Sequence, residues 1–563
     1  MGSEKIEYIN GETEPLDEVY LHLWPNAFLS ATEARPDIFL SNGSITIDSV
    51  TDETGLPLPH QITEDTNLMV NLSDSVEPGE STAFRINFSV SIPNSRFMRF
   101  GYWDKPAIHD LGNWYPVVAV YDEDGWDTSP YTFMGESFYA DVSLFDVNIT
   151  VPADQVIAAL GALTQKIVNP DDTVTWTWKT GMVRDFFFAS SPDFEVASRM
   201  IGDIEISSYY FQNYTSRGLA ALDTAENSVK VFGSLFKPYP YPTLSIVQSL
   251  DRYLGMEYPN LVLMGYNLYN ETLYSLADFE EVLSHELGHQ WFAYMVGNDP
   301  YCEPWLDEGF ATYSEIIYFE FVHGPTAKES LLRSRRNSYF SALSDESVNH
   351  TMEFWESVKI PRAYSPIVYA KGCLIIEMLR LEVGNSTFFE ALQKYTDDFL
   401  YKNARISDLI AVFEEAAGYD LDWFFEEWIF GRGIPRYSLN STQAHSLKDG
   451  YRLVLNVTQE AYPKKMLVPF KIVYQEGSET RTAWVNETQQ TIEFNLDKKP
   501  IRVIMDPDYL ILRTPRGPIS LEVVTRERGD NTLLYGILIS TVVAISLVTI
   551  YLWMRRWSRV AED

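Results

Sequence analysis

The stretch HELGHQWF, which begins at His285, restricts the fold of this chain more than any other. In a helix, residues four apart lie on one face, one turn above the other, so the imidazoles of His285 and His289 can reach one metal ion. Glu286 lies about 100° further around such a helix, where it can reach a water without binding the ion itself. The stretch therefore predicts a helix that carries part of a metal site.

Two histidines do not complete a catalytic zinc site, which usually has three protein ligands. The segment YCEPWLDEGFATYSE follows at Tyr301, and Pro304 introduces a second helical pattern that ends near His323. Helices joined by a short loop run roughly antiparallel, so Glu308 in the first turn can face the histidines. The predicted site holds one Zn²⁺ per chain, although another divalent ion could occupy it; its ligands are His285, His289 and Glu308.

Residues around these ligands give weaker signals. Ser275 with Asp278 three residues later resembles a capping box, so the first helix is expected to begin there, and Gly297 is a natural stop. Glu315 shares a helix face with Glu308 and could hold a ligand histidine in place.

Composition narrows the class of partners. A chain of 563 residues is too long for one hydrophobic core, and a formal charge of −36 argues against nucleic acid or an anionic membrane surface, because both are polyanions. The two cysteines, Cys302 and Cys373, are too few for a disulfide scaffold or a cysteine-based zinc site. A single bridge and two free thiols remain as alternatives.

One uncharged apolar run, LLYGILISTVVAISLVTIYLW at 533–553, has the length of a membrane-spanning helix. Arginines on both sides of the run leave the positive-inside bias weak. The sequence before it is rich in N-glycosylation sequons, which favours a body that faces the outside of the cell. These sequons begin at Asn42, Asn71, Asn87, Asn148, Asn213, Asn270, Asn349, Asn385, Asn440, Asn456 and Asn486.

The first residues, MGSEKIEYIN, lack the apolar core of a signal peptide, so we expect the natural start to be truncated here. The prediction is a single-pass protein of the cell membrane, anchored through its C-terminal helix. A tail-anchored protein with a cytosolic body is the alternative.

Hydrophobic periodicity predicts a multidomain α+β chain. Alternating strands such as FRINFSVSI at 84–92 and VTWTWK at 174–179 indicate an antiparallel β domain at the start, and strands return near Tyr451. The expected order is an N-terminal β domain (1–195), a mostly helical thermolysin-like peptidase domain (196–436), a small β-sandwich (437–520), a stalk (521–531), a transmembrane helix (532–554) and a cytoplasmic tail (555–563).

The pair HELGHQWF and WLDEGFA resembles the zinc signature of the aminopeptidase N family of gluzincins, HExxH followed by 18 residues and Glu. That family often has Asn where Asp307 stands. Upstream, GMEYP at 255–259 resembles the family's GAMEN exopeptidase motif, in the form of bacterial- or archaeal-type members. The resemblance implies that Gly255, Met256 and Glu257 bind substrate, with Glu257 on the free α-amine. The family's second amine contact comes from its β domain, and no residue here is assigned to it.

A third motif, VYAKG from Val368, resembles the family segment whose tyrosine stabilises the oxyanion, and that tyrosine falls on Tyr369. The implied reaction is hydrolysis of the first peptide bond of peptides with a free N-terminus, by a zinc-activated water with Glu286 as general base. One departure is that Leu254 and Tyr258 replace the Gly and Asn of GAMEN. Another is that no large helical domain follows the β-sandwich, which suggests a more open cleft. The alternatives are an endopeptidase or broad metallopeptidase on the same site, and a catalytically silent surface receptor.

Overall fold

The computed structural model describes residues 1–29, 43–94, 99–249, 253–342, 344–358 and 362–526. The chain divides into two compact units, Met1–Arg432 and Gly433–Asp563, and each is treated by itself. The predicted transmembrane helix, the cytoplasmic tail and the last part of the stalk lie outside the described residues. Among the described residues, no helix combines the length and apolarity that a membrane span requires.

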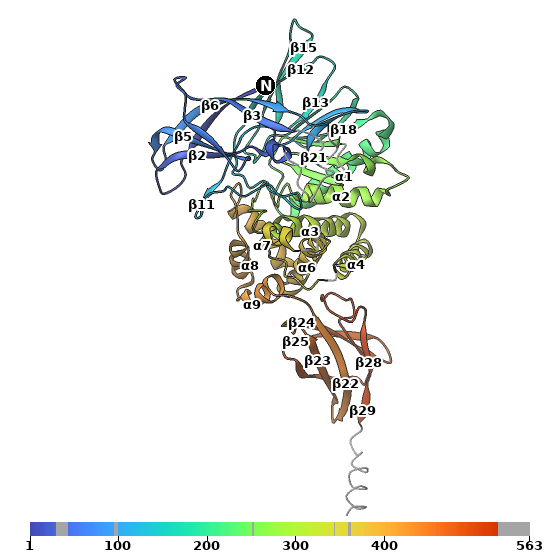
Figure 1. Ribbon diagram of the computed structural model, residues 1–563. Helices are drawn as coiled ribbons and strands as arrows, with labels where there is room; N and C mark the ends of the chain where they lie inside the picture. Colours follow the sequence, from blue (N-terminus) through green and yellow to red (C-terminus); the bar gives the residue numbers. More distant parts are fainter. Residues whose placement is uncertain (30–42, 95–98, 250–252, 343, 359–361, 527–563) are drawn as a thin grey trace, which may run out of the picture. The chain divides into compact units, whose positions relative to one another are not determined.

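The first unit begins with antiparallel sheets, as predicted (Figure 1). They have the strand orders β1-β6-β3, β4-β5-β2-β9, β13-β16-β8-β7 and β12-β15-β14, beside the hairpin β10-β11. The strands are β1 (Gly2–Ile9), β2 (Leu16–His22), β3 (Ser44–Asp52), β4 (His60–Thr63), β5 (Asn67–Val76), β6 (Ser81–Ser91), β7 (Phe100–Asp104), β8 (Ala107–Leu111), β9 (Val117–Val118), β10 (Tyr121–Asp122), β11 (Gly125–Trp126), β12 (Asp146–Pro152), β13 (Val156–Ala159), β14 (Ala162–Val168), β15 (Thr173–Lys179) and β16 (Phe188–Ser191).

A five-stranded sheet of order β17-β18-β19-β21-β20 follows, and its strand β20 is an edge strand. The strands are β17 (Phe194–Ile201), β18 (Ile204–Phe211), β19 (Thr243–Ser249), β20 (Gly255–Tyr258) and β21 (Leu261–Gly265). The predicted domain boundary at 195/196 falls inside β17. Strand β20, which carries the GMEYP motif, pairs antiparallel with β21 and places Glu257 opposite Val262.

Successive side chains of strand β20 point to opposite faces of the sheet, and those on one face pack against the β domain. Met256 and Tyr258 belong to the apolar core that β-domain side chains build, and Phe187 stacks on Tyr258 with ring centroids 4.4 Å apart. Gly255 and Glu257 therefore face the other side of the strand. The apolar side of β20 fixes the strand against the β domain, while its other side is left to the functional site.

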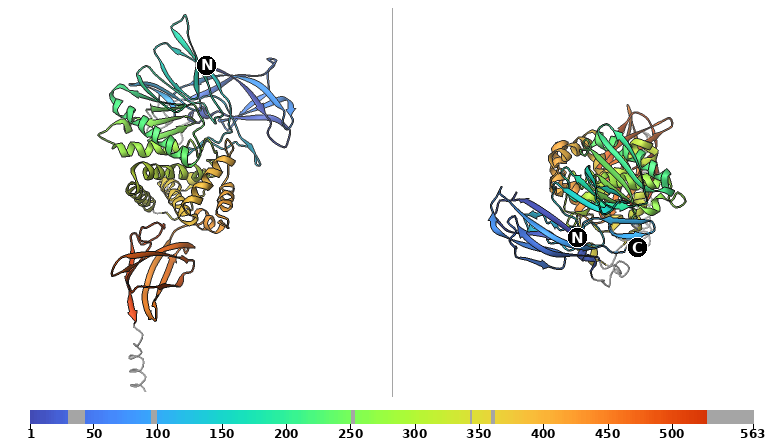
Figure 2. Two further views of the ribbon diagram at one scale, coloured as in Figure 1. Left: turned by 180° about the vertical axis from the view of Figure 1, so that it is seen from behind. Right: turned by 90° about the horizontal axis from the view of Figure 1, so that it is seen from above.

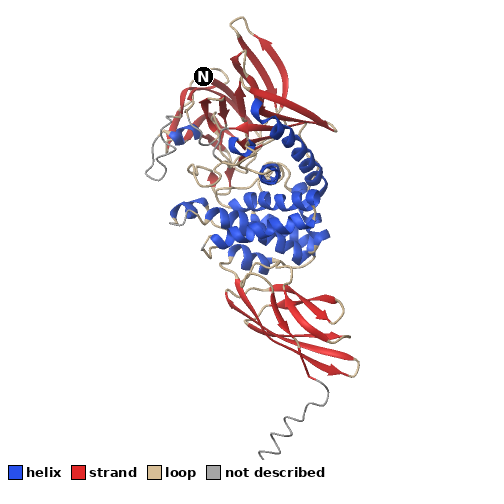
Figure 3. Cartoon of the chain, turned by 90° about the vertical axis from the view of Figure 1, so that its right-hand side faces the viewer, coloured by secondary structure: helices blue, strands red, loops and turns tan. Residues whose placement is uncertain are grey.

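Helices make up most of the remainder of the first unit and gather beside its strands (Figure 3). The α-helices are α1 (Thr215–Leu235), α2 (Leu276–Gly288), α3 (Pro304–His323), α4 (Pro325–Ser341), α5 (Met352–Ser357), α6 (Gly372–Val383), α7 (Asn385–Asp398), α8 (Ile406–Ala417) and α9 (Asp422–Phe425). Shorter 3₁₀ or π segments are η1 (Trp24–Phe28), η2 (Gln212–Tyr214), η3 (Tyr266–Tyr269), η4 (Pro366–Lys371) and η5 (Glu426–Phe430). Helices α1 and α2 pack on the five-stranded sheet, and α3 packs on α2 (Figures 1 and 2).

Helix α2 begins as predicted and ends earlier. Ser275 forms the capping box, with its N–H donating to Asp278 Oδ2 at 2.8 Å. The helix stops at Gly288 rather than near Gly297. The next residue but one, Gln290, is fixed outside the helix, because its side chain bonds to the β20–β21 connection through Asn260 N at 2.7 Å. The hydrophobic periodicity of the sequence cannot predict this contact, because it joins two distant segments of the chain.

The second unit contains two four-stranded sheets, of order β26-β23-β22-β29 and β25-β24-β27-β28. Strands such as β23 alternate buried and half-buried residues over most of their length. The ring of Phe470 in one sheet lies 6.0 Å from that of Phe494 in the other, between centroids. The strands are β22 (Pro435–Leu447), β23 (Gly450–Ala461), β24 (Met466–Tyr474), β25 (Ser478–Val485), β26 (Gln489–Leu496), β27 (Pro500–Met505), β28 (Ile519–Glu522) and β29 (Val524–Arg526).

The two cysteines are free thiols. Cys302 is exposed in the loop before α3, whereas Cys373 is buried in α6. The bridge between them, left open by the sequence, is absent from the structure.

The crossing of α2 and α3 depends on the small size of Gly288. A Cβ atom at this position would lie 2.7 Å from the Cβ of Ser314. We expect Gly288→Ala to force the helices apart and to lower the free energy of unfolding by about 1–3 kcal/mol, as overpacking does. Thermal and urea unfolding of the variant measure this loss.

Gly233 in α1 is the matched control for this substitution. A Cβ at Gly233 meets its nearest atoms at 3.9 and 4.0 Å, so Gly233→Ala should be neutral or slightly stabilising in a helix. Equal stability of the two alanine variants would contradict the close crossing.

Candidate active site

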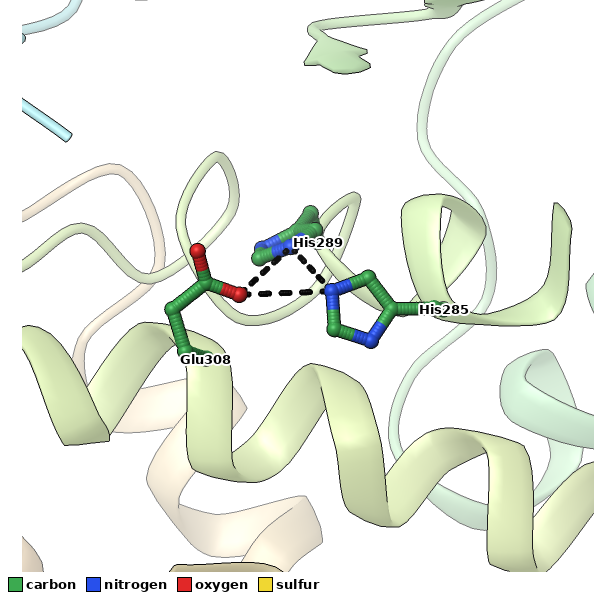
Figure 4. A group of neighbouring side chains, drawn as sticks. All are labelled: His285, His289 and Glu308. Atoms are coloured by element: carbon green, nitrogen blue, oxygen red, sulfur yellow. Dashed lines mark hydrogen bonds and ion pairs between the residues drawn. The ribbon is translucent and has the colours of Figure 1, made fainter. Parts of the chain in front are cut away.

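Three predicted ligand atoms converge where α2 ends and α3 begins (Figure 4). His289 Nε2 lies 3.2 Å from His285 Nε2. Glu308 Oε2 lies 3.3 Å from the Nε2 of His285 and 3.6 Å from that of His289. The helix pair thus brings together residues that lie in two separate motifs of the sequence.

This donor set fits a zinc ion. Ligand atoms around a tetrahedral ion with bonds of about 2.0–2.1 Å lie roughly 3.3–3.4 Å apart, close to the separations observed here. Glu308 Oε2 is buried and accepts no hydrogen bond from the described residues, so it is free to bind a cation. Two imidazole nitrogens and a carboxylate are the ligands typical of a catalytic zinc centre.

Acceptors on the far side of each imidazole orient the two histidines. His285 Nδ1 contacts Glu315 Oε1 at 2.9 Å, the contact expected from the helix face that Glu315 shares with Glu308. His289 Nδ1 faces the carbonyl oxygen of Phe292 at 3.3 Å and Asp307 Oδ1 at 2.5 Å. A proton held on each Nδ1 leaves the Nε2 lone pair for the metal.

Asp307 is the residue that departs from the family's usual Asn. Its side chain is 3% exposed, so its contact with His289 is shielded from water. The sequence showed the departure, and the structure shows that it places a second buried carboxylate behind a ligand histidine.

Glu286 faces the edge strand of the sheet at very short range. A Cβ at Gly255 would lie 2.2 Å from Glu286 Oε1, so a glycine is needed where this backbone passes the carboxylate. The pKa of Glu286 is raised to about 8, mainly by burial; His285 and His289 oppose the rise, and the neighbouring carboxylates of Glu257 and Glu308 add to it. A bound cation acts in the same direction as the histidines and favours the charged carboxylate.

Glu257 lies beside this group. One oxygen of its carboxylate lies within 4.8 Å of ligand atoms of both Glu286 and His289. The residue is 7% exposed, and Tyr294 fixes its backbone by donating a hydrogen bond to the Glu257 carbonyl at 3.1 Å. The GMEYP motif and the metal motif, separate in the sequence, therefore share one pocket.

Tyr369 lies on the π segment η4 and reaches the metal ligands. Its hydroxyl donates to Glu308 Oε1, and its ring stacks on that of His285 with centroids 5.9 Å apart. The close approach of α3 to α6 makes this contact possible, since a Cβ at Gly372 would lie 3.4 Å from the Cα of Gly309. Burial and the Glu308 carboxylate raise the pKa of Tyr369, so the hydroxyl keeps its proton.

Two residues of the β domain complete the pocket and were missed by the sequence. Glu136 lines it together with Glu257 and Asp307. Arg99 holds Glu136 in a two-pronged ion pair, with N–O distances of 3.1 and 2.9 Å. Burial raises the pKa of Glu136 to about 8, and the positive charge of Arg99 opposes that rise. No local motif marks either residue; only the packing of β20 on the β domain brings them to the site.

Known proteins are similar to this chain in sequence and in fold. Residues 220–428 match the Peptidase family M1 domain. Aminopeptidase M1-B of Oryza sativa subsp. japonica is 31% identical over 259 residues, which cover 42% of this chain and 29% of that protein. Leucyl aminopeptidase of Saccharolobus solfataricus (strain ATCC 35092 / DSM 1617 / JCM 11322 / P2) is 24% identical over 314 residues, 51% of this chain and 37% of that protein. The matches thus span about a third of the length of these curated relatives.

Solved structures show the same architecture at lower sequence identity. Aminopeptidase A of Legionella pneumophila, in complex with aspartic acid, has a TM-score of 0.66 at 15% identity and covers 89% of this chain and 56% of its own. An M1 zinc metallopeptidase from Deinococcus radiodurans has a TM-score of 0.55 at 19% identity and covers 77% and 90%.

The family match and the cluster of ligand side chains together define a metallopeptidase domain within residues 220–428. More narrowly, the chain carries a peptidase family M1 domain, and its predicted kinship with the aminopeptidase N family of gluzincins is confirmed.

Loss of a ligand side chain should empty the metal site. We expect the purified protein to hold one Zn²⁺ per chain, and His285→Ala or Glu308→Ala to weaken the affinity by more than roughly 100-fold, since changes behind the ligands alone cost about 10–100-fold. Chelator competition followed by elemental analysis measures the affinity.

His323→Ala is the control for the ligand variants, because His323 lies at the far end of α3 and is 38% exposed. Zinc retained in full by the His285 and Glu308 variants would contradict this assignment of the site.

Proposed function

We propose that this chain is a zinc metallo-aminopeptidase, which hydrolyses the N-terminal peptide bond of peptides with a free α-amine. The observation that carries the proposal is the position of Glu257, buried within 4.8 Å of both Glu286 and the ligand His289. A carboxylate at this distance from the metal site can pair with the ammonium group of the first residue. It thereby selects the first peptide bond for cleavage.

The proton transfers are assigned to Glu286. When bound at His285, His289 and Glu308, zinc supplies Lewis acidity to a water and to the scissile carbonyl. Glu286 accepts the proton of the attacking water on its carboxylate and then delivers it to the leaving amine nitrogen, a general base that becomes a general acid. Gly255 supports this role, because its lack of a side chain leaves the Glu286 carboxylate room at the edge of the sheet.

Two carboxylates flank the place proposed for the substrate's amine. Glu257 comes from β20, and Glu136 comes from the β domain, where the family's second amine contact is expected. Burial favours the neutral form of Glu136, Arg99 opposes this, and a bound ammonium ion would favour the charged form further, so that both groups can pair with the amine. Attraction of a cation in this shielded pocket is stronger than at an open surface.

Tyr369 is assigned to the developing oxyanion. Tyr369 is half-buried, and its hydroxyl is protonated and lies next to the metal ligands through Glu308. A donor held in place where negative charge develops stabilises the transition state more than the ground state. Substrate binding would have to redirect this hydroxyl from Glu308 to the carbonyl oxygen.

We also propose that the chain is a membrane glycoprotein whose body faces the outside of the cell. The apolar run at 533–553 supports the anchor. Every sequon asparagine within the described residues is at least partly accessible, and Asn148, Asn213, Asn385, Asn440 and Asn486 are exposed. Tail anchoring with a cytosolic body is the alternative.

A substrate panel separates aminopeptidase from endopeptidase activity. We expect the enzyme to release fluorophore from aminoacyl-coumarin substrates and not from their N-acetylated twins, and a zinc chelator to abolish the release. Glu257→Gln should lower kcat/KM on free-amine substrates by roughly 10–100-fold, because a hydrogen bond to a charged group contributes about 1.5–3 kcal/mol.

Glu271→Gln serves as control, because Glu271 is an exposed carboxylate outside the pocket. Equal cleavage of acetylated and free substrates would remove the amine anchor and favour the endopeptidase. A protein that holds its zinc and cleaves neither substrate would contradict the proposed activity.

Cell fractionation tests the membrane proposal. When the chain is expressed behind a secretory signal, we expect it in the carbonate-resistant membrane fraction, with a mass that falls after glycosidase treatment. Deletion of residues 533–553 should release the body into the medium. Without an added signal, an unglycosylated protein with a protease-accessible cytosolic body would support tail anchoring instead.

A further inference from the structure

We propose that Arg335 is a positioning residue for the metal centre: it holds Glu315 in the orientation that directs His285 at the ion. The proposal rests on the proposed function, since it takes the site to bind zinc. Arg335 lies on α4 and touches neither the ligand atoms nor the substrate pocket. Its effect must therefore pass through the residues that it contacts.

The first link is the carboxylate of Glu315. One oxygen, Oε1, contacts His285 Nδ1 at 2.9 Å, and the other, Oε2, is held by the Arg335 guanidinium. The Glu315 side chain is 6% exposed, so water does not compete for either oxygen. With both oxygens engaged, the carboxylate has a single orientation, and the imidazole plane is fixed with it.

Arg335 also contacts helix α2, which carries His285. The same Arg335 nitrogen, Nη2, contacts Glu281 Oε1 at 2.5 Å. Glu281 lies one turn before His285 on α2, on the same face. Arg335 thus connects α2 and α3 from α4 and closes a ring of contacts behind one ligand: Glu281, Arg335, Glu315 and His285.

Charge explains why an arginine is needed here. Glu281 and Glu315 approach the same guanidinium, and without it the buried carboxylate of Glu315 would face that of Glu281, which is 31% exposed. Like charges at short range repel more strongly when one of them is shielded from water. Glu315 would then turn away from Glu281 and lose its alignment with His285. The other ligand histidine is supported separately, by Phe292 and Asp307, so the effect should be confined to one side of the ion.

The test measures metal affinity and ligand geometry in the full chain. We expect Arg335→Met to weaken zinc binding by about 10–100-fold, the range typical of changes behind a ligand, and Arg335→Lys, which keeps the charge, to lose less. In the Co²⁺-substituted protein, the visible absorption bands should shift in the Met variant. With saturating zinc, kcat should fall while KM stays close to that of the wild type, because the amine anchor is untouched.

A double-mutant cycle with Glu315→Gln tests whether Arg335 affects zinc binding through Glu315. If Arg335 acts through Glu315, the double variant binds zinc about as weakly as Glu315→Gln alone, so the two changes are strongly non-additive. Arg333→Met is the control on the same helix, because Arg333 is 69% exposed and, within the described part of the chain, its ion pair is with Glu329 on the neighbouring turn. It should leave affinity and spectrum unchanged.

Two outcomes would overturn the proposal. One is a folded Arg335→Met protein with wild-type zinc affinity and an unchanged cobalt spectrum. The other is an affinity loss that adds fully to that of Glu315→Gln, which indicates a general structural role. If the Met variant does not fold, Arg335→Lys carries the same measurements. A wild-type protein that binds zinc without cleaving peptides would sink the proposed activity and leave this test intact.

Discussion

The close crossing of α2 and α3 decides where every other group of the site must lie. At Gly288 the two backbones approach so closely that a methyl group would collide with Ser314. This approach is what brings Glu308, in the first turn of α3, within 3.6 Å of both histidine nitrogens. A second pair of glycines, Gly309 and Gly372, repeats the arrangement between α3 and α6 and delivers Tyr369. Small residues at helix crossings therefore set the dimensions of the metal centre.

Electrostatics makes the assembled site a place for cations. Buried carboxylates surround the two ligand histidines, and only part of their charge is offset by protein groups such as Arg99 and Arg335. Buried anions without partners are unstable, so the arrangement favours a divalent ion at one end and an ammonium group at the other. The β domain takes part in this balance through Glu136. It is therefore a component of the pocket as well as a support for strand β20.

Local signals in the sequence predicted the local structure well. The capping box at Ser275, the spacing of His285 and His289, and Glu308 in the first turn of α3 each depend on residues a few positions apart, and the structure has all three arrangements. Sequence did not predict the early end of α2 or the presence of Glu136 in the pocket. Both depend on contacts between distant segments, the first through Gln290 on the β20–β21 connection and the second through the packing of β20 on the β domain.

The π segment η4 restricts how many residues the chain can have between Tyr369 and helix α6. Its widened turn lets the Gly372 N–H reach the carbonyl of Ile367, five residues back, where an α-helix would reach four. Such a turn contains one residue more than an α-helical turn over the same rise. Removal of Ala370 or Lys371 would restore the α-helical spacing and rotate Tyr369 by about 100° relative to α6. The number of residues in this segment is therefore as restricted as the identity of the tyrosine, and a shortened version would fold into a regular helix that points its phenol away from the metal ligands.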